Sequence, residues 1–486
     1  MVKNRSIKWN FVMQTLLSVS SFIFPLITFP YISRILLPEG TGKVSLATSL
    51  VSYFAIIAQL GIPKYGIRAC AKVRDDKKAL TRIVHELFII NFIMTVIAYS
   101  IFFIVVMSVP QLHKEKTLYF IVSLSILFNT IGMEWLYTAL EQYTYITVRS
   151  VIFKFIAVIA MFLLVHTKDD YVIYGAISIL ASSFSNIFNF FHAHKYIEMK
   201  WLGNYNLKQH WKTVVVFFAM ACATTIYTNL DTVMLGFLKS DNDVGYYNAA
   251  VKIKNIMVSI VISLSTVLLP RASYYIQKGK KNEFERITQK SLNFVFLLAT
   301  PVVIYFILFA KSGIYFLSGS AYSGSIIPMQ VIMPTVLLIG ISNTTGIQIL
   351  VPLGREKVVL YSEIVGAVVD IVINALLIPQ YASVGAALGT LIAEASVLIV
   401  QICFLKKEVM KMFKPIQYIK IGCAILMASI ASVWVIGMEL SDFVTLLLSA
   451  IIFGTIYIGL LLILKERLIM ELFIQGINKY IRKTSC

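Results

Sequence analysis

The sequence predicts an all-α integral membrane protein with about fourteen transmembrane helices. Three observations predict this class: the apolar composition, the regular recurrence of apolar stretches, and the one-sided placement of basic residues. The 486 residues are 58% hydrophobic and only 14% charged, with a mean hydropathy of +0.81. A soluble chain carries about a quarter charged residues. The apolar excess is too large to be buried in a water-soluble globule of this length, so it must face lipid.

Apolar stretches long enough to cross a hydrocarbon core of about 30 Å recur along the whole chain. Proline in the first of these stretches (Pro25, Pro30) and in the tenth (Pro328, Pro334) predicts kinked helices. We place the stretches at 11–33, 42–62, 84–109, 117–140, 146–166, 171–193, 213–238, 244–269, 289–311, 326–351, 358–378, 384–405, 415–437 and 442–464.

Basic residues predict the orientation of these helices. With both termini in the cytoplasm, most of the 43 Lys and Arg residues fall in cytoplasmic segments, with Arg149 counted in the loop after the fourth helix. The opposite loops hold only Arg34, Lys43, Lys114, Lys116, Lys168, Lys239 and Lys311. This is the positive-inside pattern, and it explains the net charge of +19 without a nucleic-acid partner. We expect a multi-pass protein of the bacterial inner (plasma) membrane.

Two pairs of similar segments indicate an internal repeat. Residues 34–51 resemble residues 233–259, with Gly42 opposite Gly245, and residues 169–182 resemble 379–394, with Gly175 opposite Gly385. Both members of each pair start on the outer side, so the repeat is parallel, which is a known transporter plan. We expect a six-helix lobe at 1–212, a second at 213–410, and a terminal helix pair with a basic tail at 411–486.

Enzyme chemistry is not expected. The sequence has no HExxH motif, no Walker A motif and no zinc-type Cys/His spacing, and its loops are too short for a soluble domain. We therefore expect no cofactor and no metal site, with transport driven by a proton or sodium gradient or by removal of product. A membrane-embedded polysaccharide polymerase is disfavoured, because the outer loops lack converging His, Arg and Asp residues.

Four stretches of the sequence resemble the Wzx-like polysaccharide and O-antigen repeat-unit flippases. That family is the polysaccharide-transporter branch of the multidrug/oligosaccharidyl-lipid/polysaccharide flippase superfamily. The resemblance follows the chain in order over almost its whole length. The stretches are FPLITFPYISRILLPEGTGKVSLATSLVSYFAIIAQLGIPKYGIRACA at 24–71, IGMEWLYTALEQYTYITVRS at 131–150, NLDTVMLGFLKSDNDVGYYNAAVKI at 229–253 and VLLPRASYY at 267–275.

The resemblance implies two six-helix lobes around a central cavity, with two extra helices. It also implies a cargo, an undecaprenyl-diphosphate-linked oligosaccharide, moved from the cytoplasmic to the outer leaflet by alternating access. The transported repeat units would be used to build capsule, exopolysaccharide or O-antigen. Membrane lipids, a polysaccharide polymerase and chain-length proteins are the implied partners.

Cations in or next to the predicted spans are the candidate contacts for a diphosphate headgroup. Lys154 lies in the fifth span, and Lys252 and Lys254 lie in the eighth. A charge is costly in hydrocarbon, so each is a candidate functional residue, although lysines also extend to the membrane surface. Arg34 and Arg271 end the first and eighth spans, where receiving the headgroup and ordinary interfacial anchoring are both open.

Acids inside the spans are the candidates for ion coupling or gating. These are Glu134, Asp231, Asp370 and Glu394. Each also has a structural reading as the partner of an intramembrane cation, for instance Asp231 with a lysine of the eighth span. Asparagines such as Asn129, Asn186 and Asn374 have two readings as well, contact with sugar hydroxyls or hydrogen bonding between helices.

Two other transporters of the superfamily remain as alternatives. A lipid II flippase is one, because the physical features of the sequence hardly distinguish it from a repeat-unit flippase. A multidrug/cation antiporter is disfavoured, because a cavity for cationic drugs needs acids, whereas Lys154, Lys252 and Lys254 suit an anionic cargo.

Overall fold

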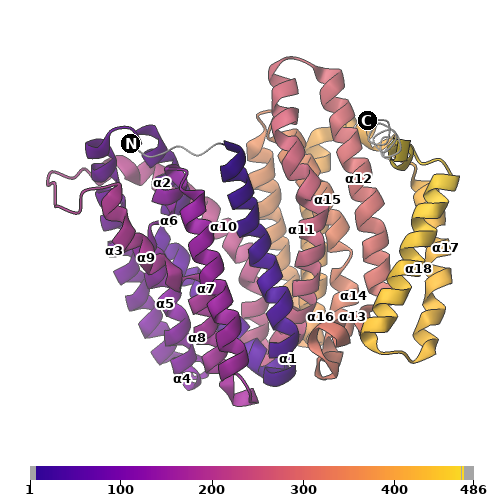
Figure 1. Ribbon diagram of the computed structural model, residues 1–486, viewed down its shortest axis with the longest axis horizontal. Coiled ribbons are helices and arrows are strands. Elements are labelled where there is room, and N and C mark those ends of the chain that lie inside the picture. Colours follow the sequence, from indigo (N-terminus) through magenta and orange to yellow (C-terminus); the bar gives the residue numbers. More distant parts are fainter. Residues whose placement is uncertain (1–6, 472, 475–486) are drawn as a thin grey trace, which may run out of the picture. The chain divides into compact units, whose positions relative to one another are not determined.

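The computed structural model describes residues 7–471 and 473–474, and every regular element in these residues is a helix (Figure 1). The chain divides into two compact units, residues 1–245 and 246–486, each treated separately below. The all-helical class of the prediction is confirmed. Within the described residues, eight helices are long and apolar enough to cross a membrane, or up to ten if each of two bent pairs is one span.

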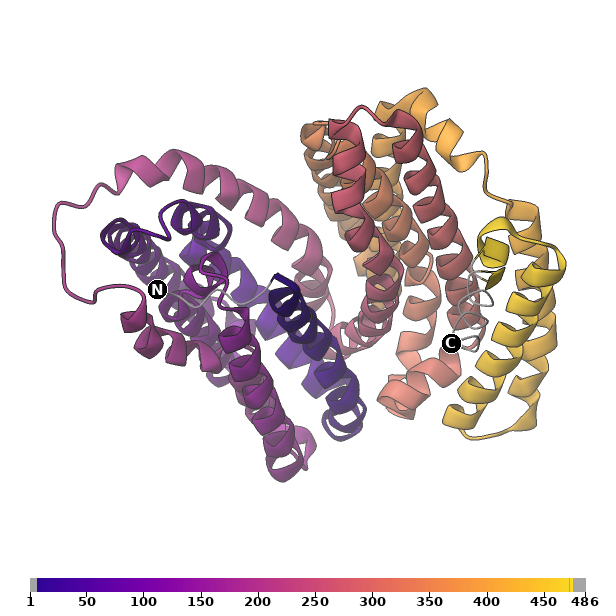
Figure 2. The ribbon, with the colours of Figure 1, turned by 45° about the horizontal axis from the view of Figure 1, so that its top comes forward.

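Unit 1 is built on α1, against which α3, α5, α7, α8 and α10 pack. Figure 2 shows the connection between η3 and α10 as an extended loop. The helices of the unit are α1 (Ile7–Gln59), α2 (Ile62–Lys72), α3 (Lys77–Ser108), α4 (Pro110–Lys114), α5 (Lys116–Gly132), α6 (Glu134–Ala139), α7 (Tyr143–Leu164), η1 (Lys168–Asp170), α8 (Tyr171–Ser182), η2 (Phe184–Asn186), α9 (Ile187–His192), η3 (Ala193–Lys195) and α10 (Lys208–Leu238).

Unit 2 begins inside α11 (Asp241–Gln277). Its long helix α16 contacts α12, α14 and α15, and α17 packs with α18 as a terminal pair. The other helices are α12 (Lys281–Leu308), α13 (Ala310–Ser318), η4 (Ser320–Ser325), α14 (Ile326–Ile332), α15 (Thr335–Asn343), the π-helix η5 (Thr344–Leu350), α16 (Glu356–Phe413), α17 (Tyr418–Val433), η6 (Trp434–Met438) and α18 (Asp442–Ile463).

The two longest helices are interrupted. At 1.5 Å per residue, α1 would extend for about 80 Å, far more than one crossing of a bilayer needs. Its break is at Leu37 (φ 59°, ψ 178°), directly before Pro38. Proline disfavours helical geometry in the preceding residue, which explains the position of the break. In α16 one break is at Ala382 (φ 47°, ψ −125°), three residues after Pro379, and a second is at Lys406 (φ 44°, ψ −125°).

Apolar side chains cover much of the outside of the helices. Strongly exposed examples are Ile104 on α3, Leu163 on α7, Ile419 on α17 and Ile463 on α18. A water-soluble monomer rarely exposes apolar surface on this scale, so these faces are suited to lipid. The structure thus supports the multi-span membrane class from its surface as well as from helix length.

Glycines that the internal repeat aligns with each other permit close helix packing. A Cβ atom on Gly42 would overlap the backbone oxygen of Asp241, and one on Gly245 would overlap that of Pro38. A Cβ on Gly385 would lie 2.5 Å from the backbone oxygen of Leu377. Backbone cannot yield as a flexible side chain does, so these positions hold the chain in its present packing.

We predict that Gly42→Ala lowers the stability of the protein, because the added methyl group must displace the start of α11. Overpacking of this kind costs about 1–3 kcal/mol. The measurement is thermal unfolding of the purified protein in detergent. Gly422→Ala on α17 is the matched control, since nothing described lies within 4 Å of a Cβ there. An equal melting temperature for both variants would contradict the packing described.

Candidate functional site

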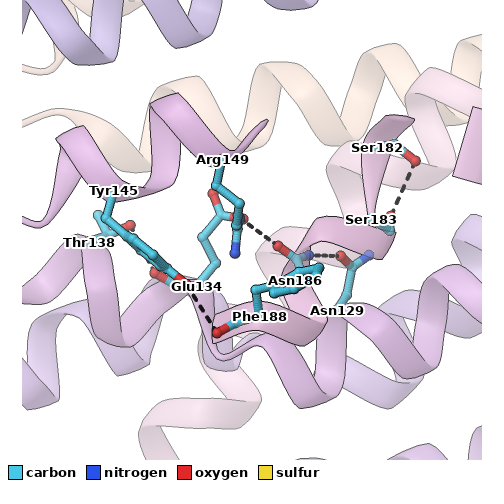
Figure 3. A network of polar contacts seen from close by, with 9 residues as sticks. All are labelled: Asn129, Glu134, Thr138, Tyr145, Arg149, Ser182, Ser183, Asn186 and Phe188. Atoms are coloured by element: carbon cyan, nitrogen blue, oxygen red, sulfur yellow. Dashed lines mark hydrogen bonds and ion pairs between the residues drawn. The ribbon is translucent and has the colours of Figure 1, made fainter. Parts of the chain in front are cut away.

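A buried arginine forms the centre of the candidate site in unit 1. Arg149 lies in the second turn of α7, and only 8% of its surface is exposed. Its Nη2 atom donates to Asn186 Oδ1 at 2.9 Å and lies 3.8 Å from a carboxylate oxygen of Glu134 (Figure 3). Asn186 in turn donates from Nδ2 to Asn129 Oδ1 at 2.8 Å. We call these four residues the Arg149 cluster.

Local backbone features place the members of the Arg149 cluster next to each other. Met133 adopts a left-handed conformation (φ 42°, ψ 42°), which ends α5 and starts α6 at Glu134. Gly132 faces Asn186, and a Cβ there would lie 2.5 Å from the Asn186 Cβ. The short η2 turn positions Asn186 on the other side. Helices distant in sequence therefore converge on one guanidinium.

The Arg149 guanidinium keeps donors available for a further partner. Its Nε and Nη1 atoms are buried and have no hydrogen-bond partner among the described protein atoms. A buried donor left unsatisfied costs about 1–3 kcal/mol, more when it is charged. The Tyr145 ring lies 5.9 Å from the guanidinium carbon and adds a cation–π contact. This arrangement is suited to an acceptor such as water or a phosphate oxygen.

Lys154 lies on α7 five residues after Arg149. Its Nζ atom donates to the hydroxyls of Ser20 and Ser21 on α1, each at 2.8 Å. The side chain is half-buried within a candidate span, so hydroxyl groups rather than a carboxylate hold its charge. No ion-pair partner of Lys154 is present within 4.0 Å in the described part of the chain. Unit 1 therefore carries two cations on one membrane helix.

The other predicted cations lie elsewhere. Lys252 and Lys254 are half-buried on α11 in unit 2. Arg34 is exposed on α1 and donates from Nη1 to the Pro30 carbonyl at 2.5 Å. Arg271 is exposed and lines a cavity of about 480 Å³ with Arg286 and other residues of unit 2. Of the predicted cations in unit 1, Lys154 lies on the helix that carries Arg149, whereas Arg34 lies on α1.

The predicted acids have different surroundings. Glu134 is partly exposed and forms the ion pair with Arg149. Asp231 is buried on α10 in unit 1. Asp370 and Glu394 are buried on the two halves of α16 in unit 2, where Gly389 abuts the side chain of Asn374. Asp370, Asn374 and Glu394 therefore share the region in which the two halves of α16 pack.

A neutral polar core lies beside the π-helix of unit 2. Thr345 Oγ1 donates to Gln401 Oε1 at 2.5 Å, and Gln401 Nε2 donates to Ser362 Oγ at 3.2 Å. All three residues are buried. π-helical turns occur frequently at functional sites, and this one brings Thr345 against α16.

Sequence reasoning missed Arg149, which it assigned to a cytoplasmic segment. The available signal was its position inside the predicted 146–166 span, three residues from the start. Of the two readings of the asparagines, the structure favours helix–helix hydrogen bonding for Asn129 and Asn186, because each bonds the other across α5 and η2.

We predict that Asn186→Ala destabilises unit 1 by about 1–3 kcal/mol, because it leaves a third Arg149 donor and the Asn129 oxygen without partners. Thermal unfolding in detergent measures this. Asn282→Ala is the control, since Asn282 is exposed at the start of α12. Unchanged stability of Asn186→Ala would mean that the Arg149 cluster is not held as described.

Comparisons with known proteins agree on one superfamily. A family model described as polysaccharide biosynthesis protein matches residues 7–276, and the MatE model matches residues 217–376. A "Putative O-antigen transporter" of Escherichia coli (strain K12) is 23% identical over 408 residues, covering 83% of this chain and 97% of the relative. The "Probable flippase AglR" of Haloferax volcanii is 26% identical over 249 residues, covering 50% of this chain and 52% of the relative.

Solved structures share the fold. The lipid II flippase MurJ in an inward closed conformation has a TM-score of 0.68 at 15% identity, covering 92% of this chain and 98% of that one. An inward-facing MATE family multidrug resistance transporter has a TM-score of 0.62 at 14% identity, covering 85% and 97%. The first family model alone covers more than half of the sequence. The chain therefore belongs to the polysaccharide biosynthesis protein family, the Wzx-like branch of the flippase superfamily, which consists of transporters and not of enzymes.

Proposed function

We propose that this protein is a flippase for undecaprenyl-diphosphate-linked oligosaccharide repeat units. It moves them from the cytoplasmic to the outer leaflet for O-antigen, capsule or exopolysaccharide synthesis. The observation that carries the proposal is the buried, incompletely bonded Arg149 guanidinium in a membrane-spanning helix of a chain from this family. A diphosphate headgroup needs fixed donors and positive charge in place of its hydration shell.

We propose fourteen spans, a count that the helix inventory supports when each interrupted helix is counted by its parts. Eight helices pass as candidate spans, and the two that contain Leu37 and Ala382 are each too long for one crossing, so we count each twice. The two bent pairs contribute one span each. We assign the last two to α5, a shorter apolar helix, and to α11, which is long enough to cross the membrane. An even count keeps both termini on the cytoplasmic side, as the basic residues predict.

Within this proposal, Arg149 and Lys154 are the diphosphate contacts of unit 1, and Lys254 and Lys252 are those of unit 2. Arg149 presents a planar set of donors suited to bidentate phosphate binding, whereas lysine acts as a point charge. Arg34 and Arg271 would receive or release the headgroup at the ends of their helices. The cargo would be moved by alternating access, with the bacterial plasma membrane as its site.

The acids divide into two proposed roles. Glu134 serves as the counter-ion of Arg149, because the two side chains lie 3.8 Å apart. Asp370 and Glu394 are the better candidates for proton or sodium coupling, because both are buried in the body of unit 2, and Asp231 is a third candidate in unit 1. A buried acid on a membrane helix is the group through which ion gradients commonly act.

A multidrug/cation antiporter is the second candidate function. The match of the MatE model to residues 217–376 favours it, and that region includes Asp231 and Asp370. The buried cations favour the flippase instead, since a site for cationic compounds would repel its ligand at Arg149 and Lys154.

A deletion strain of the host tests the proposal. We expect loss of one surface polymer and accumulation of lipid-linked repeat units on the cytoplasmic leaflet. Lys154→Ala and Lys254→Ala should restore surface polymer about ten- to a hundred-fold less well than the wild type, because each removes one charged contact worth about 1.5–3 kcal/mol.

The control is Lys200→Ala at equal protein level, because Lys200 is exposed in the loop before α10. It should restore polymer fully. Unchanged polymer in the deletion strain together with increased drug sensitivity would favour the antiporter and contradict the flippase. Full rescue by both lysine variants would remove their proposed role in binding the cargo.

A further inference from the structure

A second cationic site lies at the end of unit 1 where α2, α3 and α10 meet. A cavity of about 810 Å³ opens there. Its rim carries Arg68 and Lys72 from α2, and Lys78 and Arg82 from α3. We call this cavity the basic pocket. Its volume is in the range of sites that hold small organic ligands.

Helix geometry makes the four rim cations converge. Arg68 and Lys72 are four residues apart on α2, and Lys78 and Arg82 are four apart on α3, so each pair projects from one face of its helix. Like charges at this spacing destabilise a helix by a few tenths of a kcal/mol. Helix stability therefore does not explain the arrangement. The positive-inside pattern accounts for basic residues in this segment, and binding of an anion between the two helices would account for their convergence on one cavity.

The rim cations form no close ion pair with the described protein atoms, although the carboxylates of Glu86 and Glu198 also line the basic pocket. In the part of the chain that the structure describes, none of the four side chains forms an ion pair within 4.0 Å or a hydrogen bond. The neighbouring Arg74, by contrast, pairs with Glu141 at 3.0 Å. Asp76 is committed to the cap of α3, accepting from the backbone N–H groups of Lys78 and Ala79.

A buried network forms the floor of the basic pocket and fixes its three helices. Glu86 is fully buried and accepts from Asn206 N at 2.8 Å and from Gln209 Nε2 at 2.7 Å. His210 is also buried, with Nε2 2.7 Å from Glu86 and Nδ1 2.8 Å from the Tyr65 hydroxyl. The chain Tyr65–His210–Glu86 joins α2, α10 and α3, so the spacing of the rim cations is set in advance of binding.

Two exposed tryptophans near the basic pocket indicate its depth relative to a membrane. Trp201 lies in the loop that borders the pocket, and Trp211 lies in the first turn of α10. Tryptophan is enriched at the level of lipid headgroups. A cationic cavity at that level is placed to meet phosphate groups.

We propose that the basic pocket binds the phosphate or diphosphate group of a membrane lipid. The proposal does not depend on which cargo the protein moves or on whether it moves one. The rim cations lie on helices other than α7, so this site has its own residues apart from the Arg149 cluster. The same chemistry occurs in an anionic phospholipid, in a polyprenyl diphosphate and in free pyrophosphate, which the test separates.

The test measures binding to the purified full-length protein in detergent. The probes are phosphatidylglycerol, undecaprenyl diphosphate and pyrophosphate. Phosphatidylcholine is the reference, because its zwitterionic headgroup carries a phosphate but no net charge. The variant Arg68→Gln/Arg82→Gln removes one rim cation from each helix. The matched control Lys64→Gln/Lys77→Gln removes the same charge from exposed residues of the same two helices that do not line the pocket.

We expect the wild type and the control to bind at least one of the three anionic probes more tightly than phosphatidylcholine. The pocket variant should bind that probe about tenfold or more weakly at unchanged melting temperature. Preference for either lipid over pyrophosphate supports a lipid as the source, and equal binding of pyrophosphate supports a free anion in the same site. Equal weakening of both variants would reduce the effect to general surface charge and overturn the proposal. Binding of phosphatidylcholine as tightly as the anionic probes would overturn it as well.

Discussion

Charge placed inside a membrane helix must be held by other polar groups, and Arg149 is where this requirement shapes unit 1. Hydrocarbon offers no hydrogen bonds, so the guanidinium depends on Asn186 and Glu134 for its partners. Asn186 depends on Asn129, and Gly132 leaves the space that Asn186 occupies. The left-handed Met133 ends α5 where Glu134 is required. Several departures from regular helix thus have one common cause.

The Arg149 guanidinium is also incompletely hydrogen-bonded, and its remaining donors are what relates this cluster to transport of an anionic group. A purely structural arginine would be expected to use all of its donors, whereas Nε and Nη1 of Arg149 have no partner among the described protein atoms. Lys154 on the same helix is held by two serine hydroxyls and no carboxylate. Positive charge is therefore retained on α7, in a form that an anionic group can still use. Unit 2 holds the buried acids Asp370 and Glu394 and a neutral polar core beside its π-helix.

The helices were predictable from the sequence, because the length of an apolar stretch and the position of a proline determine helix formation locally. The break before Pro38 follows from the geometry of one peptide unit. The membrane class follows from composition. The polar contacts were not predictable, because Asn129 and Asn186 are 57 residues apart, and Lys154 lies 133 and 134 residues from the serines that hold it. Nothing local in the sequence indicates which of many asparagines and serines converge.

Arg149 illustrates the limit in a single residue. A basic residue near a predicted helix end has two explanations, a cytoplasmic anchor or an intramembrane charge, and a boundary error of a few residues exchanges them. The structure shows that the side chain is held by protein, since α7 starts six residues before Arg149 and the side chain turns inward. Family resemblance cannot replace this information, because it indicates the kind of cargo but not which cations reach it.

Translocation by the purified protein in lipid vesicles tests the central claim most directly. The substrate is a fluorescent saccharide on a polyprenyl diphosphate, and a membrane-impermeant quencher reports how much of it occupies each leaflet. We predict faster exchange between leaflets than in protein-free vesicles, and exchange about tenfold or more slower for Arg149→Gln reconstituted at equal amount and equal stability. Exchange no faster than in protein-free vesicles, or an Arg149→Gln variant as fast as the wild type, would contradict the account.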